Sequence, residues 1–112
     1  MNNINNLNGK EKIMIQNLVN NNGNFAVNQF VINGNNGVYF KSYDSMICLY
    51  KNGKLYVSPL WDYSNTTRKH FYIFLKKHTP FRYCTSKKDV LDMFKNGDFV
   101  EVNEASITPS IV

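Results

Sequence analysis

Five side chains could in principle act in catalysis or metal binding: Cys48, Asp62, His70, His78 and Cys84. The two histidines are eight residues apart. On a helix this spacing separates them by about two turns, which is too far for both to bind one metal ion. Cys84 could pair with His78 if the chain between them folds back, but no orienting carboxylate or glycine-rich oxyanion loop adjoins them. We therefore expect no metal, no cofactor and no enzymatic activity.

Other catalytic motifs are incomplete. The glycine-containing segment 33–37 lacks the lysine and the following helix of a phosphate-binding loop. A magnesium-dependent nuclease needs clustered carboxylates, and residues 51–95 contain three aspartates, two of which suit helix termini. Ser64 and Tyr63 have no neighbouring base, and helix capping accounts for Ser64.

Composition indicates a folded domain. The chain has 112 residues, of which 43% are hydrophobic and 14% aromatic, so we expect one domain over residues 1–112, with frayed ends at 1–9 and 104–112. The two cysteines are too few for a disulfide scaffold, and neither a secretory leader nor a membrane-spanning apolar run is present. These features predict a soluble, cytoplasmic protein.

Positive charge is concentrated in the second half of the chain. Residues 51–95 hold ten Lys or Arg and three Asp, a local charge of +7, against a total of +5. The excess of lysine over arginine and the many asparagines are typical of an AT-rich genome. The charge pattern favours an anionic partner, either nucleic acid or an acidic protein face, while a solvated lysine surface is the alternative.

The N-terminal half is predicted to be a short helix followed by strands. Apolar residues at helical spacing predict an amphipathic helix over residues 10–19 that ends by Gly23. Strands are expected over 25–32, 38–43, 45–50 and 55–58. The Asn52-Gly53 pair between the last two predicts a two-residue hairpin turn, because both residues readily adopt positive φ.

This hairpin turn sets a register. Lys51 is expected opposite Lys54, Tyr50 opposite Leu55, Leu49 opposite Tyr56, and Cys48 opposite Val57. We assign to the core the face that carries Met46, Cys48, Tyr50, Leu55 and Val57. The other face has Ile47, Leu49 and Tyr56 at its middle, so we expect it to be partly covered or to bind a partner.

The C-terminal half is predicted to form two helices and a strand. Ser64 caps a helix over 65–77, and Ser86 with Asp89 resembles the capping box of a second helix that ends by Gly97. A strand over 99–102 follows. The expected fold class is α+β: a single two-layer domain with an antiparallel β-meander packed by two to three short helices.

A corner of five residues connects the hairpin to the first of these helices. We expect the rings of Trp61 and Tyr63 to be buried under the helix start, and Asp62 to accept from helix amides or pair with Arg68. This structural corner comprises Trp61, Asp62, Tyr63, Ser64 and Thr67. The predicted partner-binding residues are basic or aromatic and lie outside the expected core: Lys51, Lys54, Arg68, Lys69, Tyr72, Lys76 and Lys77.

The Trp-Asp-Tyr-Ser-Asn-Thr-Thr-Arg-Lys-His run at 61–70, with the hairpin before it, resembles a small uncharacterised family. The similarity covers roughly residues 38–78. Members of that family resemble short proteins of phages and mobile elements in low-GC Gram-positive bacteria. The resemblance implies a non-enzymatic accessory protein of the bacterial host cytoplasm that binds and blocks a host macromolecule, such as a CRISPR effector nucleoprotein, as anti-CRISPR proteins do. The alternative is a nucleic-acid-binding accessory protein that uses a basic, aromatic face.

Overall fold

The computed structural model describes residues 12–109 and contains an α+β arrangement of six strands and two α-helices. The strands are β1 (Met14–Val19), β2 (Phe25–Asn33), β3 (Val38–Ser42), β4 (Ser45–Lys51), β5 (Lys54–Val57) and β6 (Phe99–Glu101). The helices are α1 (Asn65–His78) and α2 (Lys87–Asn96). Two 3-10 turns, η2 (Pro59–Asp62) and η3 (Glu104–Ile107), precede α1 and follow β6.

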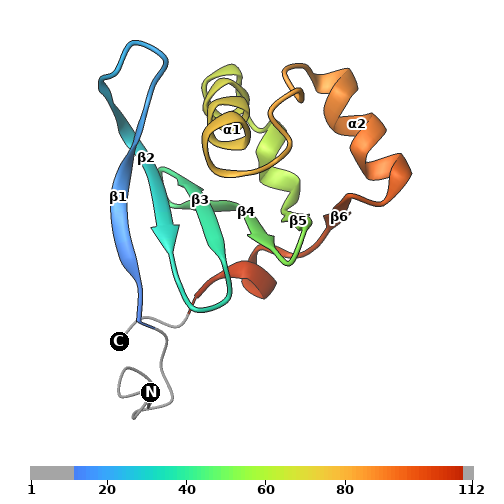
Figure 1. The fold of residues 1–112 in the computed structure, drawn as a ribbon, viewed down its shortest axis with the longest axis horizontal. Coiled ribbons are helices and arrows are strands. Elements are labelled where there is room, and N and C mark those ends of the chain that lie inside the picture. The colour runs from blue at the N-terminus through green and yellow to red at the C-terminus, as the bar shows by residue number, and fades with distance from the viewer. Residues whose placement is uncertain (1–11, 110–112) are drawn as a thin grey trace.

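All six strands form one sheet in the order of the chain, β1-β2-β3-β4-β5-β6 (Figure 1). Neighbouring strands are antiparallel except β5 and β6, which are parallel. Parallel neighbours require a long crossover, and η2, α1 and α2 provide it. Both helices are therefore inserted between two adjacent strands.

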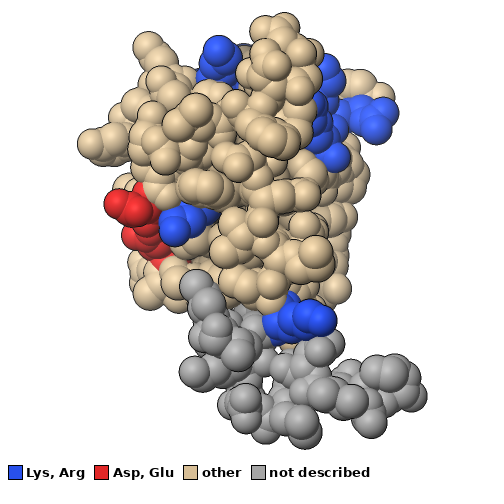
Figure 2. Space-filling view, turned by 90° about the vertical axis from the view of Figure 1, so that its left-hand side faces the viewer, with Lys and Arg blue, Asp and Glu red and all other residues tan. Residues whose placement is uncertain are grey.

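The first element differs from the prediction. Residues 14–19 were expected to be helical, but they form β1, which pairs with β2 from Met14 opposite Asn33 to Val19 opposite Phe25. The apolar residues of this strand stand in two adjacent pairs, Met14-Ile15 and Leu18-Val19, so the sequence lacks the two-residue alternation by which a strand is recognised. Only Leu18 is fully buried. Figure 2 views this side of the molecule, where most of the surface is uncharged.

The hairpin register is confirmed, but the assignment of faces is wrong at two residues. Lys51 lies opposite Lys54, and Cys48 opposite Val57, as predicted. Towards β3, however, Phe40 pairs with Cys48 and Lys41 with Met46, which leaves Ile47 as the extra residue of a bulge. Ile47 consequently packs with the helices, and Met46 packs in the cluster on the other face of the sheet.

The main core lies between the sheet and the helices. Phe40 of β3 stacks on Phe74 of α1 with ring centroids 5.4 Å apart, and Phe71, Leu75 and Val90 belong to the same buried cluster. Ile73, which lies between Lys69 and Lys76 in the sequence of α1, is also buried in this cluster.

A second, smaller cluster lies on the opposite face of the sheet and includes Tyr39, Leu49 and Ile107. The predicted fraying from residue 104 is wrong for this segment: η3 packs on β4, Ile107 is buried, and the Glu104 carboxylate accepts a 2.8 Å hydrogen bond from the Met46 amide. The apolar middle of this face is thus partly covered. The frayed ends predicted at 1–9 and 110–112 lie outside the described residues.

Both α-helices begin at the predicted serines. Ser64 accepts from the Thr67 amide at 3.1 Å and Ser86 accepts from the Asp89 amide at 3.2 Å, which satisfies amides that a helix start leaves unpaired. Gly97 closes α2 with φ of 87°, in the left-handed region that glycine tolerates. Neither helix is long and apolar enough to cross a bilayer within residues 12–109.

Candidate interaction groove on helix α1

The corner before α1 is anchored by Trp61. Pro59 begins η2, and Ser58 before it is buried with its hydroxyl donating to the Met46 carbonyl at 2.7 Å. The Trp61 ring is 7% exposed and packs against Phe71 of α1 and Phe94 of α2, with centroids 5.8 and 6.5 Å away. One aromatic side chain therefore contacts both helices.

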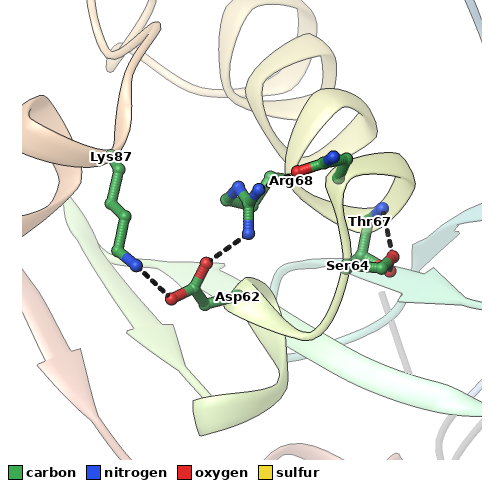
Figure 3. Close-up of polar contacts among 6 residues, drawn as sticks. Asp62, Ser64, Thr67, Arg68 and Lys87 are labelled. Atoms are coloured by element: carbon green, nitrogen blue, oxygen red, sulfur yellow. Dashed lines mark hydrogen bonds and ion pairs between the residues drawn. The ribbon is translucent and has the colours of Figure 1, made fainter.

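Asp62 lies between two cations. Its Oδ1 is 2.6 Å from the Arg68 guanidinium and its Oδ2 is 2.8 Å from the Lys87 ammonium (Figure 3). The hydrogen bond from Lys87 is the largest cause that lowers the pKa of Asp62, and Arg68 lowers it further. Of the two roles predicted for Asp62, pairing with Arg68 is confirmed, and the bridge to Lys87 links α2 to the same corner.

Tyr63 departs from the prediction. Its ring was expected to be buried under the helix start, but the side chain is 79% exposed. Thr67 is instead the buried polar residue at this point, and its hydroxyl lies 3.1 Å from that of Ser64 and 3.3 Å from that of Ser42 on β3. This hydroxyl cluster attaches the first turn of α1 to the sheet.

The outer face of α1 borders a groove of about 390 Å³, which we call the basic groove. Helix α1 forms its floor. Asn21, in the β1–β2 turn, and Thr85, between the two helices, border it from elsewhere in the chain. Its lining residues are Asn21, Asn65, Arg68, Lys69, Tyr72, Ile73, Lys76 and Thr85.

The groove is positively charged because three of its lining residues are cationic and none is a carboxylate. Lys69 and Lys76 are exposed, and neither takes part in an ion pair within residues 12–109. Arg68 is held by Asp62 and also donates to the side-chain oxygen of Asn65. Partial burial raises the pKa of the Tyr72 hydroxyl, so this group is neutral at physiological pH.

Three predicted partner-binding residues lie outside the basic groove. Lys77 donates to the carbonyls of Val19 and Asn20 at 2.8 and 2.9 Å and thereby ties the end of α1 to the β1–β2 turn. Lys54 donates to the Gly97 carbonyl at 3.0 Å, and Lys51 faces it in the hairpin. Four of the seven predicted residues are brought together: Arg68, Lys69, Tyr72 and Lys76.

Four lining residues were not predicted: Asn21, Asn65, Ile73 and Thr85. The sequence placed Asn21 just after the predicted helix over residues 10–19. Residues 14–19 form β1 instead, and the pairing of β1 with β2 brings Asn21 beside α1. The helical spacing of Asn65, Arg68, Tyr72 and Lys76 at three or four residues is the signal that could have identified Asn65 as part of the same stripe.

Burial disfavours the reactive form of both thiols. Burial raises the pKa of Cys48 well above its ordinary value and that of Cys84 to about 12, which disfavours the nucleophilic thiolate. His78 stacks on Phe74 with centroids 5.4 Å apart, and burial lowers its pKa. Across residues 12–109, no three His, Cys, Asp or Glu side chains are grouped closely enough to hold a metal ion.

The sequence matches the model of a family of unknown function, DUF8033, over residues 13–92. The matched segment includes every residue that lines the basic groove. No curated protein and no solved structure matches the chain. Because the family match covers well over half of the sequence, the chain belongs to the DUF8033 family.

Proposed function

We propose that this chain is a non-enzymatic binding protein that blocks a host macromolecule through the basic groove, and that its target is a nucleoprotein such as a CRISPR effector. We further propose that the domain has two layers, in which the antiparallel meander supports the helix that carries the groove. The observation that carries the proposal is the convergence of Arg68, Lys69 and Lys76 on one carboxylate-free groove.

The cations of the groove are suited to a ligand because the fold does not use all of them. Lys77 and Lys54 bond to backbone carbonyls, whereas Lys69 and Lys76 extend from α1 without an ion-pair partner among residues 12–109. Lysines that are not needed for packing keep their charge available for an anionic partner.

Arg68 contributes a different property. Its guanidinium bonds to Asp62 and Asn65, so its position is set before any partner arrives. A preorganised cation loses less conformational entropy on binding than a mobile one does. We infer that Arg68 orients the partner and that Lys69 and Lys76 supply most of the long-range attraction.

Tyr72 favours nucleic acid as part of the target. A half-buried ring beside Arg68 and Lys69 offers a stacking surface next to phosphate-binding groups, the combination that proteins use for single strands. This observation also supports the second candidate function, a nucleic-acid-binding accessory protein. A nucleoprotein target presents bases, phosphates and acidic protein surface together.

The test compares two variants with the same change in net charge. Lys69→Glu/Lys76→Glu reverses the groove but keeps Arg68, whose removal would also break the bond to Asp62. Lys51→Glu/Lys95→Glu is the matched control outside the groove. A purified CRISPR effector with its guide RNA and a single-stranded oligonucleotide are the two probes, each measured by fluorescence anisotropy at two salt concentrations.

We expect the groove variant to lose at least about tenfold in affinity and the control to lose much less. Binding to the effector alone supports the blocking function. Binding to the bare oligonucleotide with a steep salt dependence supports the accessory function instead. Equal losses in both double variants would show that only net charge matters and would contradict a site at the groove.

A further inference from the structure

A second pocket, of about 420 Å³, is formed where the turn between β3 and β4 meets the corner before α1. It shares no lining residue with the basic groove, and we call it the tyrosine pocket. Its lining residues are Ser42, Tyr43, Asp44, Ser45, Ile47, Leu60, Tyr63 and Thr67.

Two tyrosines that line this pocket are exposed. Tyr43 is 52% exposed and Tyr63 is 79% exposed. Tyr63 belongs to the structural corner, where its ring was expected to be buried, so the corner forms without using this ring in the core. Exposed tyrosine rings offer a flat aromatic face to a partner.

The backbone of Tyr43 is strained. Its φ is 54°, in the left-handed region that glycine and asparagine adopt readily and a bulky residue rarely does. Glycine at this place in the turn would remove the strain, and the fold covers only about half of the tyrosine. A strained aromatic residue beside a pocket points to a functional role for its side chain.

Charge indicates the kind of ligand. Asp44 is the only charged residue that lines the tyrosine pocket, and its carboxylate takes part in no ion pair within residues 12–109. The buried lining residues are neutral: Ser42, Ile47 and Thr67. An unpaired carboxylate next to aromatic side chains suits a cation, which the faces of the rings attract as well.

We propose that the tyrosine pocket binds an arginine side chain of a partner protein. A guanidinium stacks on tyrosine rings and donates two parallel hydrogen bonds to one carboxylate, and the ammonium of lysine lacks this geometry. The occupant belongs to a protein and is not free arginine, because no cation among the described lining residues could hold the α-carboxylate of the amino acid. This site goes beyond the function proposed for the basic groove, since it has the opposite charge and does not depend on that groove.

The net charge of +5 is compatible with this contact. Arg68 follows Thr67 in the chain, but its guanidinium is already paired with Asp62. Charges farther away are screened, because the Debye length is about 8 Å at physiological ionic strength. The positive charge of the chain therefore slows the encounter with a basic partner more than it weakens the bound state.

An NMR titration of the full chain tests the proposal. N-acetyl-arginine amide is the probe, and N-acetyl-citrulline amide, its neutral isostere, is the control ligand. The arginine probe should shift the backbone amide signals of residues 43–45 and 63 saturably, with a dissociation constant of about 1 mM for a ligand of this size. The citrulline control should shift them little, because it has no charge to pair with Asp44.

Two variants with matched controls locate the site. Asp44→Asn should weaken arginine binding at least about tenfold, whereas Glu101→Gln, which removes an exposed carboxylate elsewhere, should leave it unchanged. Tyr63→Leu should weaken binding about two- to fivefold through the loss of a cation–π contact. Tyr83→Leu is its control, since Tyr83 is 85% exposed and lies outside the pocket. The amide spectrum of each variant shows whether it is folded.

Three results would overturn the proposal. The first is the absence of a saturable shift at residues 43–45 and 63, and the second is arginine binding that is unchanged in Asp44→Asn. The third is free L-arginine that binds clearly more tightly than the amide, which would indicate a small-molecule site. Lys69→Glu/Lys76→Glu should bind the arginine probe at least as well as the wild type does, so failure of the basic groove and failure of the tyrosine pocket are distinguishable.

Discussion

The ammonium nitrogen of Lys87 lies 2.8 Å from Oδ2 of Asp62, which joins the first residue of α2 to the turn that precedes α1. A guanidinium nitrogen of Arg68 lies 2.6 Å from the other carboxylate oxygen of Asp62, Oδ1. One aspartate thereby holds both helices and also orients the arginine of the basic groove. Changes at Asp62 should affect stability and binding together.

Replacing Asp62 with Asn should reduce stability at neutral pH, because two ion pairs lose their anion. The pKa of Asp62 in the folded chain is lowered, chiefly by Lys87, so its contribution is fully present above the ordinary carboxyl pKa. The contribution is lost as the pH falls through the lowered value. Urea unfolding of both proteins should therefore show a constant difference from pH 7 down to about pH 5, and a shrinking difference below about pH 4.

Asp92→Asn is the control for this measurement. Asp92 pairs with Lys88 on the exposed surface of α2, where ion pairs contribute little. Its removal should change stability less than the removal of Asp62 does at every pH. A difference between wild type and Asp62→Asn that persists unchanged into strong acid would contradict the assigned ion pairs.

Replacing Gly37 with Ala should destabilise the fold strongly. Gly37 has φ of 149°, and a Cβ at this position would lie 2.1 Å from the backbone carbonyl oxygen of Tyr50. Backbone cannot move aside as a flexible side chain can, so we expect a loss of more than about 3 kcal/mol in the free energy of unfolding. Gly23→Ala is the matched control. Gly23 has φ of 83°, and a Cβ added there would have no neighbouring atom within 4 Å, so this substitution should lower the free energy of unfolding by only about 1–2 kcal/mol.

Replacing Gln29 with Leu should raise stability. The Gln29 side chain is fully buried, and neither its amide nitrogen nor its oxygen has a hydrogen-bond partner within residues 12–109. Removing an unsatisfied buried amide should gain about 1 kcal/mol, which chemical denaturation can measure. The exposed Gln16→Leu control should change the free energy of unfolding by less than about 0.5 kcal/mol. A clear loss of stability in Gln29→Leu would show that the amide is bonded.

Both cysteines should resist alkylation in the folded protein. Burial raises the pKa of Cys84 to about 12 and leaves its side chain 4% exposed, so almost no accessible thiolate exists at neutral pH. Mass spectrometry after iodoacetamide treatment should show an unmodified native chain and two modifications after unfolding. Rapid native labelling at Cys84 would reopen a role for its thiol, as would loss of partner binding in Cys84→Ser.

Local sequence was sufficient to predict the structure wherever neighbouring residues determine the backbone conformation. Asn52 and Gly53 adopt φ of 52° and 83°, and the turn they form sets the pairing of β4 with β5 as predicted. Ser64 and Ser86 cap their helices because the amides they satisfy lie within one turn. The stripe of Arg68, Lys69, Tyr72 and Lys76 likewise follows from helical periodicity alone.

Tertiary structure decided what depends on distant partners. The apolar residues of 14–19 are compatible with either a helix or a strand, and pairing with β2 selected the strand. The bulge at Ile47 reversed the faces of two residues because β3 and the helices, not the hairpin turn, determine that part of β4. Asn21 and Thr85 became neighbours of α1 through the fold, so the sequence could predict a basic helix face but not the groove that it borders.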